Sequence, residues 1–247
     1  MSTFDIRAAD VKQGSLVLVN ESLPFESEPD TQSLVLLGGV LLVRQAANML
    51  KAAIAYAGAE ESIVAVSGFR TMKEQKSIYA ASLRGNGSGF TSKYVALPGC
   101  SEHHTGLAVD LAENKENIDF IRPDFPYSGV CGRFRKCAAE YGFVERYPKG
   151  REHITHIAHE PWHFRYVGYP HSAIMEARGD TLEEYTEYLK RFRYGDERLK
   201  LEFRGRRFEI FFVPQGARGI ELPEGVPYQL SGNNDDGAVV TLWGSRK

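Results

Sequence analysis

The sequence predicts an α+β protein that carries a small all-β appendage at its C-terminal end. Within residues 1–195, segments with the 3.6-residue periodicity of helices occur together with short apolar runs of the strand type. After Gly195 the helical pattern stops, and β-branched and aromatic residues dominate. We therefore expect residues 1–195 to form one domain and residues 196–247 a β-rich appendage.

Composition is that of an ordinary folded protein. Hydrophobic residues make up 43% and charged residues 25% of the 247 residues, which argues against disorder and fibrous repeats. The net charge of -2 gives no electrostatic reason to expect binding to nucleic acid or to an anionic membrane. The longest apolar run, residues 34–43, is about half of the roughly 20 residues that a membrane span needs.

The N-terminus lacks the basic and apolar regions of a signal peptide, so we expect a cytoplasmic protein without a membrane span. The three cysteines, Cys100, Cys131 and Cys137, do not have CxxC spacing. We interpret them as free thiols rather than as a disulfide framework, although Cys131 and Cys137 could pair in an oxidising compartment.

The first half of the chain predicts two strands, each followed by a helix. Residues 16–20 are apolar and lead into a turn, as a short strand does. Residues 33–56 place apolar side chains on one helical face, although Gly38-Gly39 weakens the first turns. Residues 63–66 have the pattern of a buried strand that ends in Ser-Gly-Phe-Arg, and residues 72–83 predict the second helix.

The second half begins with a glycine-rich stretch, residues 85–89, which predicts a flexible loop. Helices are expected at residues 133–141, before Gly142, and at 182–192, after the capping box that starts at Thr181. Strand patterns occur at residues 106–110, 143–144, 163–167, 201–205, 208–213 and 239–243.

Histidines are the first indication of metal chemistry. His153, His156 and His159 are spaced by three, which on a helix would bring them near one face. Ile154 and Ile157 favour an extended segment instead, and on a strand the three side chains would not share a face. We therefore interpret this segment as a partly exposed strand rather than as a zinc site.

His103, Asp110 and His163 form a better set. Two imidazoles and one carboxylate match a catalytic zinc site whose fourth position stays open for water. A metal lowers the pKa of water from about 16 to about 7, and Glu160 can accept the proton as the water attacks a carbonyl. Arg70 can face the negative charge that develops on the carbonyl oxygen. From the residues alone, a metal hydrolase and a set of structural histidines remain equally open.

Three motifs that contain these residues resemble the zinc D-Ala-D-Ala carboxypeptidase/dipeptidase family, the VanY, VanX and VanXY type. Residues 67–70 with Gln75 resemble the family's SGYRxxxxQ element, residues 98–110 resemble PGxSEHQTGLAxD, and residues 160–168 resemble EPWHFRYVG. The similarity spans residues 15–192. It implies a Hedgehog/D,D-peptidase-like fold with a central antiparallel sheet.

The resemblance implies one Zn²⁺ per chain, and it assigns roles by position. The implied zinc ligands are His103, Asp110 and His163; the implied catalytic groups are Glu160 as the base and Arg70 as the group that polarises the scissile carbonyl. The implied substrate contacts are Gln75 and Ser101, with Ser101 at the C-terminal carboxylate. Trp162 fits the pocket wall and the core about equally well. His104 and Phe69 stand where the family more often has Gln and Tyr.

The implied reaction is hydrolysis of the D-Ala-D-Ala bond in the free dipeptide, in a pentapeptide cell-wall precursor, or in both. That reaction would remove the target of glycopeptide antibiotics such as vancomycin. The layout is most similar to the cytoplasmic VanXY type, and residues 114–132 stand at the position of its specificity loop.

Two alternatives remain open: an L,D-carboxypeptidase or murein endopeptidase on the same site, and a non-catalytic zinc- or peptidoglycan-binding module. Glu160 and Arg70 argue against the module, since binding alone needs neither. The sequence does not fix the oligomeric state.

Overall fold

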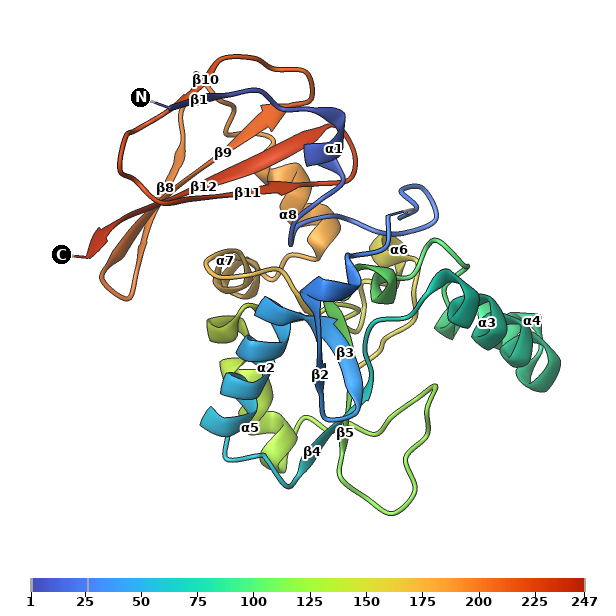
Figure 1. The fold of residues 1–247 in the computed structure, drawn as a ribbon. Coiled ribbons are helices and arrows are strands. Elements are labelled where there is room, and N and C mark those ends of the chain that lie inside the picture. The colour runs from blue at the N-terminus through green and yellow to red at the C-terminus, as the bar shows by residue number, and fades with distance from the viewer. Residues whose placement is uncertain (1, 26, 247) are drawn as a thin grey trace. The chain divides into compact units, whose positions relative to one another are not determined.

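The structure is a computed structural model that describes residues 2–25 and 27–246 (Figure 1). Contacts divide the chain into two compact units. One is the continuous segment Val19–Thr181, and the other joins the residues up to Leu18 with those from Leu182 onward. This division differs from the expected boundary after residue 195, because the start of the chain and the helix at Leu182 belong with the C-terminal strands.

A four-stranded antiparallel sheet lies at the centre of the Val19–Thr181 unit, as the family resemblance implies. Its strands are β4 (Ile63–Ser67), β5 (Ala108–Glu113), β6 (Phe143–Glu145) and β7 (His163–Tyr166), in the order β4-β5-β7-β6. Every neighbouring pair is antiparallel. In the register of the two central strands, Asp110 lies opposite His163.

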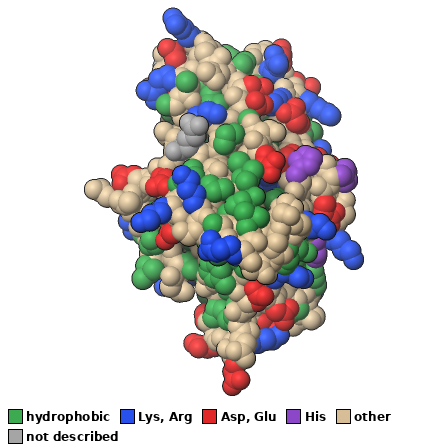
Figure 2. All heavy atoms as spheres, turned by 90° about the vertical axis from the view of Figure 1, so that its right-hand side faces the viewer, with side chains coloured by type: hydrophobic (Ala, Val, Ile, Leu, Met, Phe, Trp, Pro, Cys, Tyr) green, Lys and Arg blue, Asp and Glu red, His purple; other side chains and the backbone are tan. Residues whose placement is uncertain are grey.

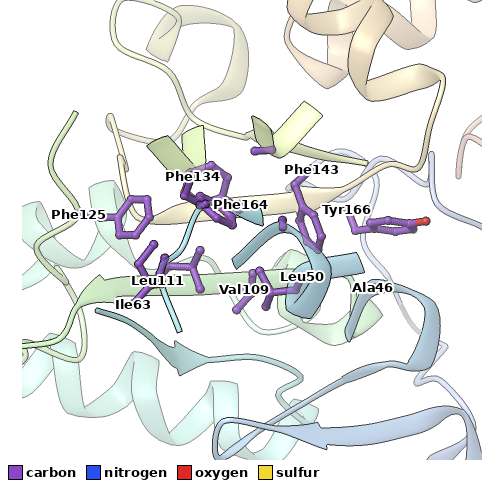
Figure 3. Close-up of a cluster of buried hydrophobic side chains, with 14 of the residues drawn as sticks. Ala46, Leu50, Ile63, Val109, Leu111, Phe125, Phe134, Phe143, Phe164 and Tyr166 are labelled. Atoms are coloured by element: carbon purple, nitrogen blue, oxygen red, sulfur yellow. The ribbon is translucent and has the colours of Figure 1, made fainter. Parts of the chain in front are cut away.

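One face of this sheet carries the hydrophobic core. Successive side chains of a strand point to opposite faces, so Val109 and Leu111 of β5 lie in the core while Asp110 does not. Helices α2 (Arg44–Tyr56) and α5 (Gly129–Ala138) contact each other and contribute to the same cluster. In Figure 3 the rings of Phe134 and Phe164 lie beside each other, with centroids 5.2 Å apart and their planes at 87°.

Apart from helix α3 (Met72–Asn86), the remaining elements of this unit are short. They are η1 (Thr31–Ser33), β2 (Leu34–Leu37), β3 (Val40–Val43), α4 (Ser88–Tyr94), η2 (Glu102–Thr105), η3 (Ala139–Tyr141), α6 (Glu152–Thr155) and α7 (His171–Arg178). Helix α3 begins at a capping box in which Thr71 and Glu74 satisfy each other's backbone N–H groups.

The second unit is mainly β-structure, as the composition after Gly195 indicates. A four-stranded sheet has the order β11-β12-β9-β8, with β8 (Leu199–Phe203), β9 (Arg206–Pro214), β11 (Tyr228–Gly232) and β12 (Gly237–Arg246). Strand β1 (Ser2–Phe4) pairs with β10 (Ile220–Leu222), and α1 (Ala8–Val11) contacts β11 and β12. Helix α8 (Leu182–Leu189) completes the unit.

The prediction of one helix over residues 33–56 was wrong for residues 33–43, nearly the first half. Residues 34–43 form an antiparallel hairpin, and the helix begins only at Arg44. Gly38 and Gly39 have φ values of 58° and 90°, which a two-residue hairpin turn requires and a helix forbids. The apolar run on both sides therefore forms paired strands.

Three further local predictions were wrong. Residues 16–20 do not form a strand; Leu18 N donates to the carbonyl of Asn233, and the Asn234 amide donates to the carbonyl of Leu18. The expected loop at residues 85–89 is reduced to Gly87, which separates α3 from α4.

Residues 153–159 are not a strand, since α6 ends at Thr155 and His156 has a left-handed φ of 59°. Figure 2 shows histidine side chains near the right-hand edge of the view. His153 and His156 are exposed.

The cysteines agree with expectation. All three cysteines are free thiols, and Cys131 and Cys137 are buried. Within residues 2–25 and 27–246, every helix is too short or too polar to cross a membrane.

Candidate active site

The sheet brings together residues from three separate segments. Asp110 of β5 and His163 of β7 lie directly opposite each other, on the sheet face away from the core. His103 comes from η2, and Gly106, with φ 67°, turns the chain from η2 into β5. A side chain at Gly106 would lie 3.0 Å from Leu34, so the tight turn needs a glycine.

The spacing of the ligand atoms fits a metal ion. One ligand atom from each of His103, Asp110 and His163 lies within 4.8 Å of the others. Asp110 Oδ1 is 2.9 Å from His163 Nδ1, and Asp110 Oδ2 is 3.1 Å from His103 Nε2. Zinc bonds of 2.0–2.1 Å in a tetrahedron place neighbouring ligand atoms about 3.3 Å apart. The three side chains therefore lie close enough together to share one metal ion.

Backbone contacts orient His103 for this role. Its Nδ1 lies 2.6 Å from the carbonyl oxygen of Gly68, which can only accept a hydrogen bond. Nδ1 must therefore carry the proton, and the lone pair of Nε2 faces Asp110. Such a second contact fixes both the tautomer and the ring orientation of a metal-binding histidine.

Burial and mutual charge shift the pKa values of all three side chains. Burial, together with the neighbouring Arg70, lowers the pKa of His103 to about 4, so this imidazole is neutral. Burial opposes the charge on Asp110, but His103 and His163 hold its pKa well below the usual value. Burial also opposes the charge on His163, but the neighbouring carboxylates of Asp110 and Glu102 outweigh it and raise the pKa to about 9.

Glu160 lies beside the cluster as a second carboxylate. Its Oε2 is 3.8 Å from His163 Nδ1, and its side chain is buried. Burial raises the pKa of Glu160 to about 8, and the charge of Asp110 adds to the rise. A divalent cation in the site would favour the ionised carboxylate and bring this pKa down. Glu160 is thus suited to exchange a proton near neutral pH.

Arg70 is held by three side chains at the rim of the cluster. Its Nη2 donates to Asp110 at 2.8 Å, its Nε donates to Ser67 Oγ at 2.7 Å, and its Nη1 donates to Gln75 Oε1 at 3.4 Å. Gln75 in turn donates to the carbonyl of Ala96 at 2.8 Å. The guanidinium is therefore fixed before any ligand binds.

All eight residues singled out from the sequence line one cavity. It has a volume of about 490 Å³ including its open mouth, and its wall contains Arg70, Gln75, Ser101, His103, Asp110, Glu160, Trp162 and His163. Trp162 belongs both to this wall and to the hydrophobic core, which joins its two expected roles. From residues 114–132, Phe120 and Ile121 reach the cavity, and Phe120 lies under the Arg70 guanidinium at 5.6 Å.

Sequence reasoning missed Glu102, which is 1% exposed and lies between two buried arginines. Arg146 Nε and Arg165 Nη1 each lie 2.8 Å from its Oε1. One signal was available, because Arg165 follows His163 by two residues on a strand and so shares its polar face. A buried arginine on that face needs a carboxylate partner.

His104 connects two loops of the site. Its Nδ1 donates to the carbonyl of Arg70 at 2.8 Å, and its Nε2 accepts from the N–H of Gly99 at 3.1 Å. The residue that departs from the family's more common Gln thus holds the backbone that carries Arg70.

An antiparallel sheet with a buried His-Asp-His cluster, a carboxylate and an arginine beside it defines a metallopeptidase. The family model described as VanY, D-alanyl-D-alanine carboxypeptidase, matches residues 41–169. The chain belongs to this family.

Individual relatives support the assignment. The chain is 42% identical over 180 residues to the bifunctional D-Ala-D-Ala dipeptidase and D-Ala-D-Ala carboxypeptidase VanXYC of Enterococcus gallinarum, covering 71% of this chain and 95% of that protein. The crystal structure of the vancomycin resistance D,D-dipeptidase VanXYg, in complex with a D-Ala-D-Ala phosphinate analog, matches with a TM-score of 0.94 and 46% identity over 98% of each chain. A mutant of the D,D-pentapeptidase VanY from a VanB-type resistance cassette, in complex with Zn(II), matches with a TM-score of 0.55 and 29% identity over 70% of this chain and 98% of that one.

Proposed function

We propose that this protein hydrolyses the D-Ala-D-Ala bond with one Zn²⁺ per chain as cofactor and Glu160 as the general base. This proposal rests on the buried cluster of His103, Asp110 and His163, with Glu160 at 3.8 Å from His163. Both the free dipeptide and the pentapeptide precursor are proposed as substrates, since the relative VanXYC carries both activities in its name. Loss of D-Ala-D-Ala ends would protect a cell against vancomycin.

His103, Asp110 and His163 would hold the ion, which would act as a Lewis acid and lower the pKa of water to about 7. Glu160 takes one proton from the attacking water as the new C–O bond forms at the scissile carbonyl. When the C–N bond breaks, Glu160 passes that proton to the amine of the departing D-Ala. Because the side chain is buried, the proton stays between the reacting groups.

Arg70 donates hydrogen bonds to the carbonyl oxygen as its negative charge grows. Its contacts to Ser67, Gln75 and Asp110 keep the guanidinium oriented, so little rearrangement is needed during the reaction. Ser101 would bind the C-terminal carboxylate of the substrate, with Gln75 beside it. All these residues lie within the Val19–Thr181 unit.

The test is release of D-alanine by the zinc-loaded protein from D-Ala-D-Ala and from UDP-MurNAc-pentapeptide, side by side. We expect release from both, and a loss of roughly 10²–10⁴-fold in Glu160→Ala, because a general base contributes that much. Glu152→Ala is the matched control, since this exposed carboxylate lies eight residues away in the same segment and should leave the rate unchanged.

Release from one substrate alone would restrict the proposal to that branch. A zinc-loaded protein that releases nothing from either would contradict the proposal. A tetrapeptide substrate would then test the L,D-carboxypeptidase alternative.

A further inference from the structure

Glu102 is a buried carboxylate with one occupied oxygen and one free oxygen. Its Oε1 accepts a hydrogen bond from Arg146 Nε and forms an ion pair with Arg165 Nη1, and all three side chains are at most 1% exposed. Its Oε2 has no hydrogen-bond partner within the described part of the chain. Burying a carboxylate is costly unless each oxygen has a partner, so Oε2 needs a hydrogen-bond donor.

His163 Nε2 is the atom that Oε2 faces, at 3.6 Å. It too lacks a hydrogen-bond partner among the residues that the structure describes. The rest of the ring is enclosed: Nδ1 faces Asp110, the ring of Tyr147 lies over it at 4.9 Å, and the ring of His103 meets it at 5.1 Å and 82°. Nε2 is therefore the side of the ring that Glu102 faces.

A histidine that binds a metal through Nδ1 must carry its proton on Nε2, and that proton needs an acceptor. We propose that Glu102 is a positioning residue for the metal site, whose carboxylate accepts a hydrogen bond from the Nε2–H of His163 and so holds the Nδ1 lone pair toward the metal. This inference rests on the proposed function, because it concerns the same ligand set. Arg146 and Arg165 hold the carboxylate in place without touching the ligand atom.

Glu102→Gln separates this role from a merely structural one. The two arginines carry only donors, so the glutamine must turn its carbonyl oxygen toward them and its NH₂ group toward His163. The NH₂ group of the glutamine would then face the Nε2–H of His163, and both are donors. This favours the tautomer in which Nε2 has no proton and the metal-facing Nδ1 carries it. Because the volume of the side chain stays the same, the substitution weakens metal binding without changing the packing.

The experiment measures zinc affinity by competition with a chromogenic chelator, together with the visible spectrum after Co²⁺ substitution. We expect Glu102→Gln to bind zinc about 10–100-fold more weakly and to change the Co²⁺ spectrum. Glu102→Asp keeps the charge and should recover part of the affinity. Glu145→Gln is the matched control, because Glu145 is paired with Arg135 away from the ligands and its loss should leave zinc affinity unchanged.

A second measurement uses the unaltered protein and so does not depend on any variant folding. Nitrogen-15 NMR of the zinc-loaded, histidine-labelled protein should show His163 protonated at Nε2 and not at Nδ1. A proton on Nδ1 would overturn the inference, as would Glu102→Gln with wild-type zinc affinity and Co²⁺ spectrum. A wild-type protein that fails to bind zinc would instead contradict the proposed function.

Discussion

At the scale of single residues, the planar guanidinium of Arg70 donates hydrogen bonds through all three of its nitrogens. One guanidinium reaches Ser67, Gln75 and Asp110 at once, which the single ammonium of a lysine cannot do. We expect Arg70→Lys to lower kcat for D-alanine release by about 10²–10³-fold, as loss of an oriented donor does. Zinc content, measured on the same sample, should stay at the wild-type level; loss of zinc would mean that Arg70 mainly supports Asp110.

His104 offers a substitution for which the expected result is almost no change. The two nitrogens of its ring have the same separation as the oxygen and nitrogen of a Gln amide, so Gln can bond both Arg70 O and Gly99 N. We expect His104→Gln to change the free energy of unfolding by less than about 0.5 kcal/mol. His104→Ala should cost about 2–4 kcal/mol, because two buried hydrogen bonds and their packing are lost. Urea unfolding of both variants measures the difference, and a large cost for the Gln variant would contradict this account.

The residues of the candidate site could be found from the sequence because each stands in a motif with fixed spacing. His103 and Asp110 are seven residues apart, and Glu160 precedes His163 by three. Glu102 stands in the same motif directly before His103, but the motif gives no indication of its partners. Its importance depends on Arg146 and Arg165, which reach it only once the sheet has formed.

At the scale of elements, the hairpin β2–β3 is fixed to the end of β4 by a close backbone contact. A Cβ on Gly68 would lie 2.4 Å from the carbonyl oxygen of Leu41, and Phe69 N donates to that same oxygen. The oxygen cannot move away without losing its hydrogen bond. We therefore expect Gly68→Ala to lower the free energy of unfolding by about 1–3 kcal/mol.

Gly85→Ala serves as the opposite case within the same experiment. Gly85 is an exposed helical residue of α3, and a Cβ there would meet nothing within 4 Å. We expect this variant to gain about 0.5–1 kcal/mol, because alanine restricts the unfolded chain and favours helix. Equal effects of the two substitutions on chemical unfolding would show that the Leu41 contact is not the cause.

Elements with a clear period were predictable, and those with an ambiguous one were not. Strand β4 and helix α5 were found because their patterns end at turns or glycines. The apolar run over residues 34–43 fits a helix and a strand equally well by periodicity. The positive φ values of Gly38 and Gly39 decided the outcome, and only the pairing of the two strands makes them necessary.

At the scale of the whole molecule, the buried neutral His171 makes the free energy of unfolding depend on pH. Burial lowers the pKa of His171 to about 3 from its ordinary value of 6.5. Below pH 6.5 the unfolded chain binds a proton that the folded chain does not, so stability falls as the pH falls. Between pH 6.5 and pH 5 this amounts to about 2 kcal/mol.

Urea unfolding at pH 7 and at pH 5 measures this effect. We expect His171→Gln to lose less stability between the two pH values than the wild type does. The control His153→Gln removes an exposed histidine and should follow the wild type. A His171→Gln variant with the wild-type pH dependence would show that other groups dominate.

The fold class and the β-rich tail were predictable, because both follow from the local pattern and the resemblance. The division into units was not. The pairing of Ser2–Phe4 with Ile220–Leu222 joins segments more than two hundred residues apart, and a short run such as Ser-Thr-Phe carries no trace of that partner. Periodicity and composition are local properties, whereas this contact is not.

The placement of the first strand has a consequence for synthesis on the ribosome. Val19–Thr181 is complete as soon as it has left the exit tunnel, so the unit that holds the candidate active site can fold while translation continues. The other unit must wait, because Ser2–Phe4 is made before the Val19–Thr181 unit and its partner β10 is made after it. Residues 2–4 therefore stay without their strand partner while the Val19–Thr181 unit is made and folds. During that interval a chaperone could bind them.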